Sequence, residues 1–180
     1  MADDLALGLN DILADRLEVV FCGINPGLMA SATGHHFAGR GNRFWRTLHL
    51  AGFTPEEIRP ENDRSILDYR CGLTAVVARP TARADQLSTR EFTAVAAAFE
   101  RKIAHYAPRY VAFLGKTAYA EMSRQRTLEW GRQRQTFGGA GVWLLPNPSG
   151  RNLSFTLSQL VDAYGQLHQA SRPTANTRLS

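Results

Sequence analysis

The clearest chemical signal in the sequence is the segment Gly23-Ile24-Asn25-Pro26-Gly27, which directly follows a run of apolar residues. The amide side chain of Asn25 offers one carbonyl acceptor and one amino donor. The two glycines allow close approach to the backbone, so several N–H groups can point at one anionic or carbonyl oxygen. The segment therefore predicts a small polar binding site at the end of a strand, with a plain strand-end turn as the alternative.

A second candidate is the segment at residues 146–152, whose sequence is PNPSGRN. Pro146 and Pro148 stiffen this loop, and Arg151 is expected at its exposed tip. A rigid loop that carries an arginine beside a strand end could enter a nucleic-acid duplex. Arg151 could instead hold a phosphate, because its planar guanidinium binds phosphate oxygens in pairs.

Both segments need a scaffold that brings strand ends together. Short apolar runs predict buried strands at residues 17–24, 72–77, 109–115 and 142–146. Helical patterns cover residues 42–51, 88–103, 117–122 and 156–170, and leucines and an isoleucine at helical spacing predict a short amphipathic helix within the first sixteen residues. Strands alternating with helices predict an α/β fold, an open and mostly parallel sheet with helices on both faces. Ligands of such folds bind outside the carboxyl ends of the strands, where both candidate segments fall.

The length of 180 residues predicts a single domain spanning residues 1–180, with a frayed tail at about residues 172–180. No apolar run is long enough for a membrane span, and the acidic N-terminus does not resemble a signal peptide. The two cysteines, Cys22 and Cys71, lie far apart, which excludes a disulfide scaffold, a cysteine-rich zinc module and a four-cysteine iron–sulfur cluster. A cytoplasmic location is the expectation from this cysteine usage.

The charge balance points to a partner class. The chain has 21 basic and 16 acidic residues, a net charge of +5 and a pI near 9.7. Only Lys102 and Lys116 are lysines, so the positive charge is carried almost entirely by arginine. Arginine binds phosphates bidentately and stacks on bases, which nominates nucleic acid as a partner. A compositional preference for arginine on solvated faces explains the same numbers.

Six short motifs occur together in one order. They are residues 23–27 (GINPG), Phe37, residues 42–45 (NRFW), 51–54 (AGFT), 67–72 (LDYRCG) and 145–150 (LPNPSG). Together they resemble the mismatch-specific uracil/thymine-DNA glycosylase family over residues 17–168, and most of all its bacterial members that act on G:U mismatches. The resemblance implies a three-layer α/β/α fold with a short, mostly parallel sheet. It also implies a monomeric, monofunctional DNA N-glycosylase of base-excision repair that acts on mismatched double-stranded DNA without a metal or cofactor.

The first loop would form the catalytic half of the site. By resemblance, Asn25 matches the asparagine that orients the attacking water, and backbone groups around Ile24 and Gly27 would bind the flipped pyrimidine. Phe37 matches the aromatic residue that stacks on the base, although it could also be an ordinary core phenylalanine. The small residues Gly27 and Ala30 leave room for a base with a 5-substituent, so ethenocytosine and thymine join uracil as candidate substrates.

The second loop would contact DNA through Asn147, Ser149, Gly150 and Arg151. Arg151 occupies a position where bacterial relatives often have a leucine, and the thymine-DNA glycosylase branch also has arginine there. This exchange replaces apolar filling of the duplex by hydrogen bonding, which could involve the guanine opposite the flipped base. Asn147 stands where the classical uracil-DNA glycosylases have a histidine, which predicts a slower enzyme that favours good leaving groups.

Asp85 is a further catalytic candidate from the residues alone. It lies in a polar stretch after a predicted strand, and a carboxylate near the pocket could assist the water or the developing cation. The alternative is an exposed carboxylate that pairs with Arg83.

Other conspicuous residues have simpler interpretations. His35 and His36 adjoin each other without a spaced third ligand, so a metal site is not expected. The three tryptophans, Trp45, Trp130 and Trp143, are predicted to pack in the core or against helices.

Two other functions fit parts of the sequence. A noncatalytic mismatch- or damage-binding protein could use the same pocket for a flipped base. A small-molecule enzyme on a doubly wound sheet is less well supported, because the chain has neither a dinucleotide-binding glycine motif nor a phosphate-binding loop.

Overall fold

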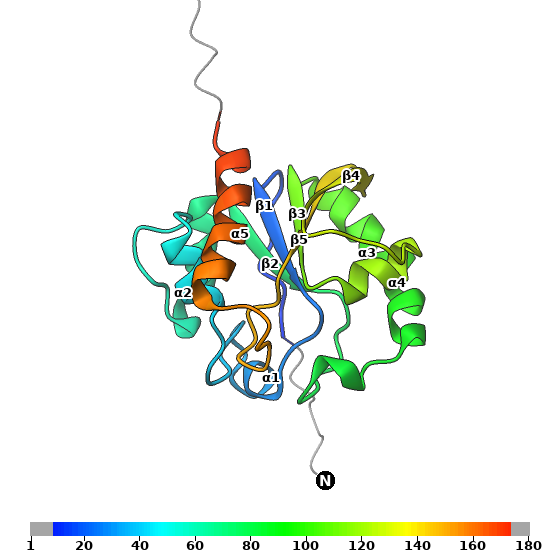
Figure 1. Ribbon diagram of the computed structural model, residues 1–180, viewed down its shortest axis with the longest axis horizontal. Coiled ribbons are helices and arrows are strands. Elements are labelled where there is room, and N and C mark those ends of the chain that lie inside the picture. Colours follow the sequence, from blue (N-terminus) through cyan, green and yellow to red (C-terminus); the bar gives the residue numbers. More distant parts are fainter. Residues whose placement is uncertain (1–8, 174–180) are drawn as a thin grey trace, which may run out of the picture.

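The computed structural model describes residues 9–173 and shows a three-layer α/β/α arrangement around one five-stranded sheet (Figure 1). The strand order is β2-β1-β3-β5-β4, and all neighbours are parallel except β4 and β5. The strands are β1 (Val19–Gly23), β2 (Cys71–Ala75), β3 (Tyr110–Leu114), β4 (Gly131–Phe137) and β5 (Ala140–Leu145). The α/β class and the mostly parallel sheet predicted from the sequence are confirmed.

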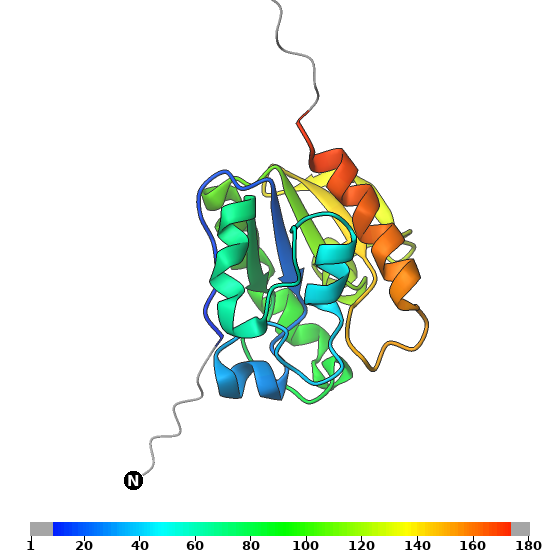
Figure 2. The ribbon, with the colours of Figure 1, turned by 90° about the vertical axis from the view of Figure 1, so that its left-hand side faces the viewer.

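Each face of the sheet is covered by its own helices. The helices are α1 (Leu28–Thr33), α2 (Phe44–Leu50), α3 (Thr89–Tyr106), α4 (Thr117–Ser123) and α5 (Leu157–Ser171), with 3₁₀ turns η1 (Pro60–Tyr69) and η2 (Ala84–Gln86). The layer of α2, η1 and α5 covers one face, and α3 and α4 cover the other (Figures 1 and 2). Successive strand residues point to opposite faces, so Phe21 packs in the first layer and Val20 and Cys22 pack in the second. The central strands are therefore apolar throughout.

The structure corrects the predicted N-terminal helix. Residues 1–8 lie outside the described part of the chain, but residues 9–16 form no helix. Ile12 instead pairs with Leu73 through two backbone hydrogen bonds of 2.9 and 2.8 Å. Gly72 permits this approach, since a Cβ atom there would lie 2.7 Å from the carbonyl oxygen of Ile12. Apolar residues that are spaced for a helix face here lie in an extended segment that pairs with β2.

Two features of the far edge also differ from expectation. The edge strand β4 was not predicted, because its sequence, GRQRQTF, is polar and its side chains are mostly exposed. Trp45 and Trp143 are buried as predicted, but Trp130 is 40% exposed. Its ring lies 4.5 Å from Nζ of Lys116 and edge-on to Phe155, so it packs on a surface loop.

The C-terminal tail predicted at about residues 172–180 falls almost wholly outside the described residues.

The topology places a crevice next to β1. The chain passes from β1 to β2 on one side and reaches β3 on the other, so the strand order reverses between β1 and β3. At such a point the loops after neighbouring strands diverge and leave space for a ligand. Gly115, directly after β3, has a φ of +99°, and a Cβ there would lie 3.5 Å from Ile24 and 3.9 Å from Asn147. These are ordinary contact distances, so the positive φ is what favours glycine here, and the turn after β3 lies next to both candidate loops. In residues 9–173 no helix is both long and apolar enough to cross a membrane.

Candidate active site

One pocket of about 730 Å³ opens at the carboxyl ends of the strands. All ten candidate residues line it: Ile24, Asn25, Gly27, Ala30, Phe37, Asp85, Asn147, Ser149, Gly150 and Arg151. They come from four separate loops and α1, and the longest sequence separation among them exceeds half the chain. The fold therefore brings together all the candidate site residues named from the sequence.

The Asn25 side chain has a fixed orientation. Its Nδ2 donates to the carbonyl oxygen of Arg79 and to Oγ1 of Thr81, both at 2.8 Å. Because a backbone carbonyl can only accept, the amide end that faces Arg79 must be the NH₂ group. Both amide hydrogens are thereby used, and Oδ1 has no hydrogen-bond partner among residues 9–173. Asn25 can act in the pocket as an acceptor.

Thr81 links the first loop to the segment after β2. Its hydroxyl accepts from Asn25 and donates to the carbonyl oxygen of Arg83 at 2.7 Å, and its N–H donates to the carbonyl oxygen of Pro26 at 3.1 Å. Thr81 is 6% exposed, so these bonds are shielded from water. The buried threonine holds the backbone and the side chain of the first loop in register.

The wall of the pocket near β1 is apolar and has little bulk. Ile24 and Ala30 are buried and Gly27 is exposed, and a Cβ atom at Gly27 would meet no other atom within 4 Å. Phe37 lines the pocket and at the same time stacks on Phe44, with ring centroids 4.0 Å apart and an interplanar angle of 24°. Phe37 thus belongs to both the pocket wall and the edge of the core.

The segment that carries Phe37 is held in an uncommon conformation, with a φ of +56° at Phe37. The N–H of His36 donates to Oδ2 of the buried Asp63 at 2.9 Å, and His36 Nε2 lies 2.7 Å from the carbonyl oxygen of Asn10. Burial lowers the pKa of His36 below its ordinary value, so the neutral ring donates from Nε2 to this carbonyl. His35 Nδ1 lies 3.5 Å from the same Asp63 carboxylate. These contacts hold the segment of Phe37 in place, and with it the aromatic wall that Phe37 forms in the pocket.

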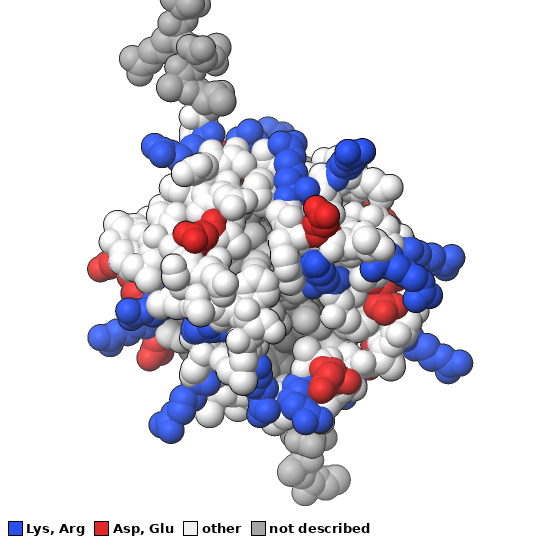
Figure 3. Space-filling model, viewed as in Figure 1, with Lys and Arg blue, Asp and Glu red and all other residues white. Residues whose placement is uncertain are grey.

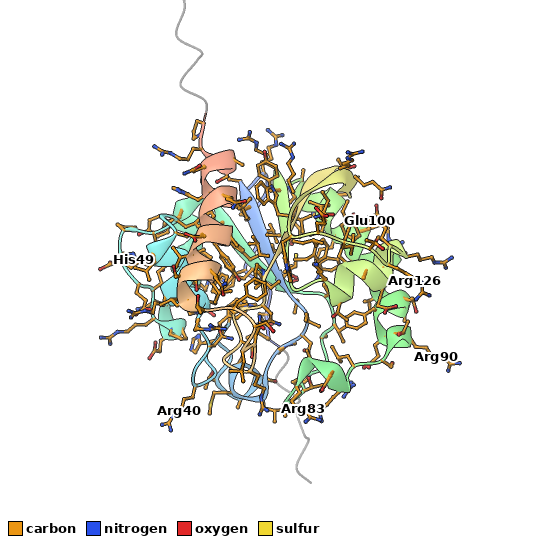
Figure 4. The ribbon with its side chains drawn as sticks, viewed as in Figure 1. Arg40, His49, Arg83, Arg90, Glu100 and Arg126 are labelled. Atoms are coloured by element: carbon orange, nitrogen blue, oxygen red, sulfur yellow. The ribbon has the colours of Figure 1, made fainter. Side chains whose placement is uncertain are left out.

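Asp85 lies at the rim of the pocket. Its carboxylate is 72% exposed and is 3.2 Å from Nε of Arg83. This is the exposed ion pair that the sequence offered as the alternative to catalysis, and it leaves Asp85 able to reach the pocket only from its mouth. Arg83 and Arg40 also line the pocket, and Figure 4 shows both at the end of the molecule where the strands terminate.

The second loop, which in the structure comprises residues 146–155 between β5 and the cap of α5, is braced by its own side chains. Oδ1 of Asn147 accepts from the N–H of Ser149 at 2.9 Å, and Oγ of Ser149 accepts from the N–H of Arg151 at 3.2 Å. Nδ2 of Asn152 donates back to the carbonyl oxygen of Asn147 at 2.9 Å. The Arg151 side chain is exposed, as predicted for the loop tip.

Gly150 is where the second loop packs on its neighbour. A Cβ atom there would lie 2.8 Å from the carbonyl oxygen of Gly41, closer than such atoms come in folded proteins. The start of the loop is tied to α5, because the buried hydroxyl of Tyr164 donates to the carbonyl oxygen of Pro146 at 3.0 Å. The loop is therefore fixed on both sides.

Sequence reasoning missed two residues that position this site. Thr81 lies in the stretch singled out for Asp85, and Arg43 lies in the NRFW motif, but neither was assigned a role. Arg43 donates hydrogen bonds to the second loop across more than a hundred residues of sequence. Long-range partners of this kind leave no local signal. The exposed apolar residues Leu28 and Met29 of α1 also line the pocket and were not anticipated.

No group of three or more histidine, cysteine, aspartate or glutamate side chains within residues 9–173 could hold a metal ion. Both cysteines are buried and unpaired. Burial raises the pKa of Cys71 to about 12 and raises the pKa of Cys22 well above its ordinary value. Both thiols are therefore protonated at neutral pH and are poor nucleophiles.

Comparison with known proteins agrees with this architecture. A solution NMR structure of a Methanosarcina acetivorans protein, provisionally assigned as a uracil DNA glycosylase, superimposes with a TM-score of 0.59 at 19% sequence identity. The match covers 91% of this chain and 98% of that one, and it confirms the three-layer fold. The sequence also matches the family model described as the Uracil DNA glycosylase superfamily over residues 11–167. This match spans most of the chain, and the protein therefore belongs to the uracil DNA glycosylase superfamily.

Proposed function

We propose that this protein is a base-excision-repair DNA glycosylase that removes uracil from mismatched double-stranded DNA and leaves an abasic site. Membership of the superfamily implies DNA glycosylase activity. The observation that best supports a catalytic role is the Asn25 amide, whose two donors are bound by Arg79 and Thr81 so that Oδ1 is the atom available in the pocket. G:U pairs are the proposed principal substrate, with ethenocytosine and thymine as further bases.

The proposed reaction is hydrolysis of the bond between the base and C1′ of deoxyribose. A nucleotide leaves the stack and its base enters the pocket, where the aromatic wall at Phe37 offers a stacking surface. The bond to C1′ breaks and leaves its electron pair on the base. A water that donates a hydrogen bond to Asn25 Oδ1 adds to C1′. The water loses its proton as the new bond forms, and the base takes up a proton. An amide is not a useful base at neutral pH, so Asn25 positions the water and activates it only weakly.

Base selection follows from the shape of the pocket and from the second loop. Ala30 and Gly27 place little bulk where a substituent at position 5 of a pyrimidine would lie, which supports the wider substrate range. Arg151, exposed on a braced loop at the pocket mouth, is proposed to enter the duplex and to hydrogen-bond the guanine opposite the flipped base.

The direct test is single-turnover cleavage of a G:U duplex by the wild type and Asn25→Ala. We expect the variant to lose about 10²- to 10³-fold in rate, because a positioned water is replaced by a mobile one. Binding of the same duplex should stay within about threefold, because Asn25 contributes to the reacting geometry more than to the contact area. Asn62→Ala, at an exposed position on η1, is the matched control and should cleave at the wild-type rate.

Equal rates for wild type and Asn25→Ala would contradict the assigned mechanism. Failure of the wild type to release free base while it binds the mismatch would instead identify a noncatalytic mismatch or damage binder. A panel of uracil, ethenocytosine and thymine, each placed opposite guanine and adenine, tests the proposed substrate range in the same assay.

A further inference from the structure

Arg43, the residue directly before α2, makes four hydrogen bonds to the second loop. Its Nη1 donates to the carbonyl oxygen of Phe155 at 2.7 Å, and Nη2 donates to the carbonyl oxygens of Ser149 and Asn152, each at 3.0 Å. Its backbone N–H donates to the carbonyl oxygen of Pro148 at 3.0 Å. A single half-buried residue thus contacts the loop at four points over eight residues.

The arrangement depends on the shape of the guanidinium group. Carbonyl oxygens of a loop repel one another when they converge, and a planar cation with five donors is the side chain suited to join three of them. A lysine ammonium would carry the same charge but has no flat fork to span carbonyls in different directions. Gly150 packs directly against the backbone of Gly41. The loop backbone therefore has little freedom to shift once the bonds to Arg43 are made.

The loop that Arg43 anchors carries two exposed side chains. The carbonyl groups of residues 149, 152 and 155 face Arg43, and the side chains of Arg151 and Leu153 between them are exposed. Leu153 is 92% exposed, which makes it the most exposed large apolar side chain of the described chain. An exposed arginine and leucine on an anchored loop form a rigid projection beside the pocket.

We propose that Arg43 is the positioning residue of this projection: it holds the loop at residues 147–155 so that Arg151 enters the duplex in register with the base pocket. This proposal rests on the proposed function, because it assigns the projection to a DNA duplex. Arg43 itself does not touch the reacting atoms and acts through Arg151. A purely structural arginine would stabilise the fold without this dependence on Arg151.

A double-mutant cycle separates the two roles. Single-turnover rates on a G:U duplex are measured for the wild type, Arg43→Ala, Arg151→Ala and the double variant. We expect each single variant to lose about 10- to 100-fold in rate. Arg151→Ala removes the side chain that is proposed to enter the duplex, and Arg43→Ala lets that side chain shift, where a displacement of about 1 Å costs rates of this size. The double variant should be no more than about threefold slower than Arg151→Ala, because an unanchored loop without its arginine has nothing left to misplace.

Hydrogen exchange of the loop amides in the free protein gives a second, activity-independent measurement. Arg43→Ala should raise the exchange of residues 149–155 and leave β1 and β3 unchanged. Arg46→Ala is the matched control, since Arg46 is an exposed arginine of α2, three residues after Arg43, and has no hydrogen bond or ion pair within the described residues. Arg43→Lys keeps the charge, replaces Arg43→Ala if the latter does not fold, and should show the same pattern to a smaller degree.

The proposal would be overturned if the rate losses of Arg43→Ala and Arg151→Ala multiply in the double variant. It would also be overturned if Arg43→Ala leaves the hydrogen exchange of the loop amides unchanged. A harmless Arg151→Ala beside a damaging Arg43→Ala would overturn it as well. An inactive wild type would instead refute the proposed function, and the exchange measurement would still report whether Arg43 orders the loop.

Discussion

The hydrogen bonds of a single asparagine determine which atom it can offer to a substrate. The Asn25 amide could place either its oxygen or its nitrogen in the pocket, and the carbonyl of Arg79 together with the hydroxyl of Thr81 selects the oxygen. Thr81 is itself directed by its bond to the carbonyl of Arg83, so its lone pairs face Asn25. At the scale of residues, a chain of hydrogen bonds runs from the carbonyl of Arg83 through Thr81 to Asn25, and each polar atom in it has one available role.

Thr81→Val tests this chain of hydrogen bonds. Valine has nearly the same shape but removes the acceptor of Asn25 and the donor to Arg83, so we expect about a tenfold loss in single-turnover rate. Unfolding in urea should show a loss of about 1–3 kcal/mol, the usual cost of buried polar groups left without a partner. Thr81→Ser keeps the hydroxyl and should retain most of the rate. A valine variant as active as the serine variant would show that the amide needs no fixed partner.

At the scale of elements, helix ends adjoin both site loops and set where each loop stops. The second loop ends at Thr156, whose hydroxyl accepts from the N–H of Gln159 at 3.2 Å, while Gln159 Oε1 accepts from the N–H of Thr156 at 2.8 Å. This reciprocal cap begins α5 directly after the loop. Tyr164 of the same helix holds the other end of the loop at Pro146.

Thr156→Ala should therefore weaken α5 and with it the loop. We expect the free energy of unfolding to fall by about 1 kcal/mol, the typical effect of losing an N-cap hydroxyl. Urea denaturation measures this change, and Thr156→Ser, which keeps the hydroxyl, should stay within about 0.5 kcal/mol of the wild type. Equal losses for the alanine and serine variants would assign the effect to the threonine methyl group.

At the scale of the whole molecule, the net charge of +5 forms no single cluster on the face seen in Figure 3. Lys and Arg side chains are dispersed over the face in Figure 3, with some at the end of the molecule where Figure 4 shows Arg40 and Arg83. Several cations are already paired, most closely Arg79 with Glu91 at 2.6 Å, and this pairing lowers the pKa of Glu91 to about 2. Net charge is therefore a weaker argument for DNA binding than the residues at the pocket mouth.

The stability of the whole protein should fall as the pH drops below neutral. Burial holds the pKa of His36 below the value of 6.5 expected in the unfolded chain, so the unfolded state takes up a proton first. The stabilisation by neutral His36 is complete above pH 6.5 and is lost as the pH falls toward the lowered pKa. The slope for this one proton is at most about 1.4 kcal/mol per pH unit.

Urea unfolding of the wild type and His36→Gln at pH 7.5 and 5.5 checks this expectation. Glutamine can donate to the carbonyl of Asn10 without titrating, so the variant should lose less stability between the two pH values. His168, whose pKa is also lowered by burial, provides a remaining slope in both proteins. Identical pH dependence in the two proteins would exclude His36 as a source of acid sensitivity.

Local patterns predicted most of the scaffold. The four apolar runs became β1, β2, β3 and β5, and the four helical segments became α2 to α5, because continuous apolar runs and helical spacing reflect burial between layers. The polar strand β4 and the extended segment at residues 9–16 were missed. Pairing with β5 and with Leu73, respectively, determines their conformation, and neither partner is visible in the local sequence.

The sequence by itself determined the fold class, the uracil DNA glycosylase superfamily and the two loops that meet at the site, since each of these depends on residue types at short spacing. Only the tertiary structure decided that the Asn25 oxygen is available, that Asp85 pairs with Arg83 at the rim, and that Arg43 anchors the second loop. These depend on hydrogen bonds and ion pairs whose geometry arises when the loops are packed together. Spacing along the chain does not encode which donor will face which acceptor across the pocket.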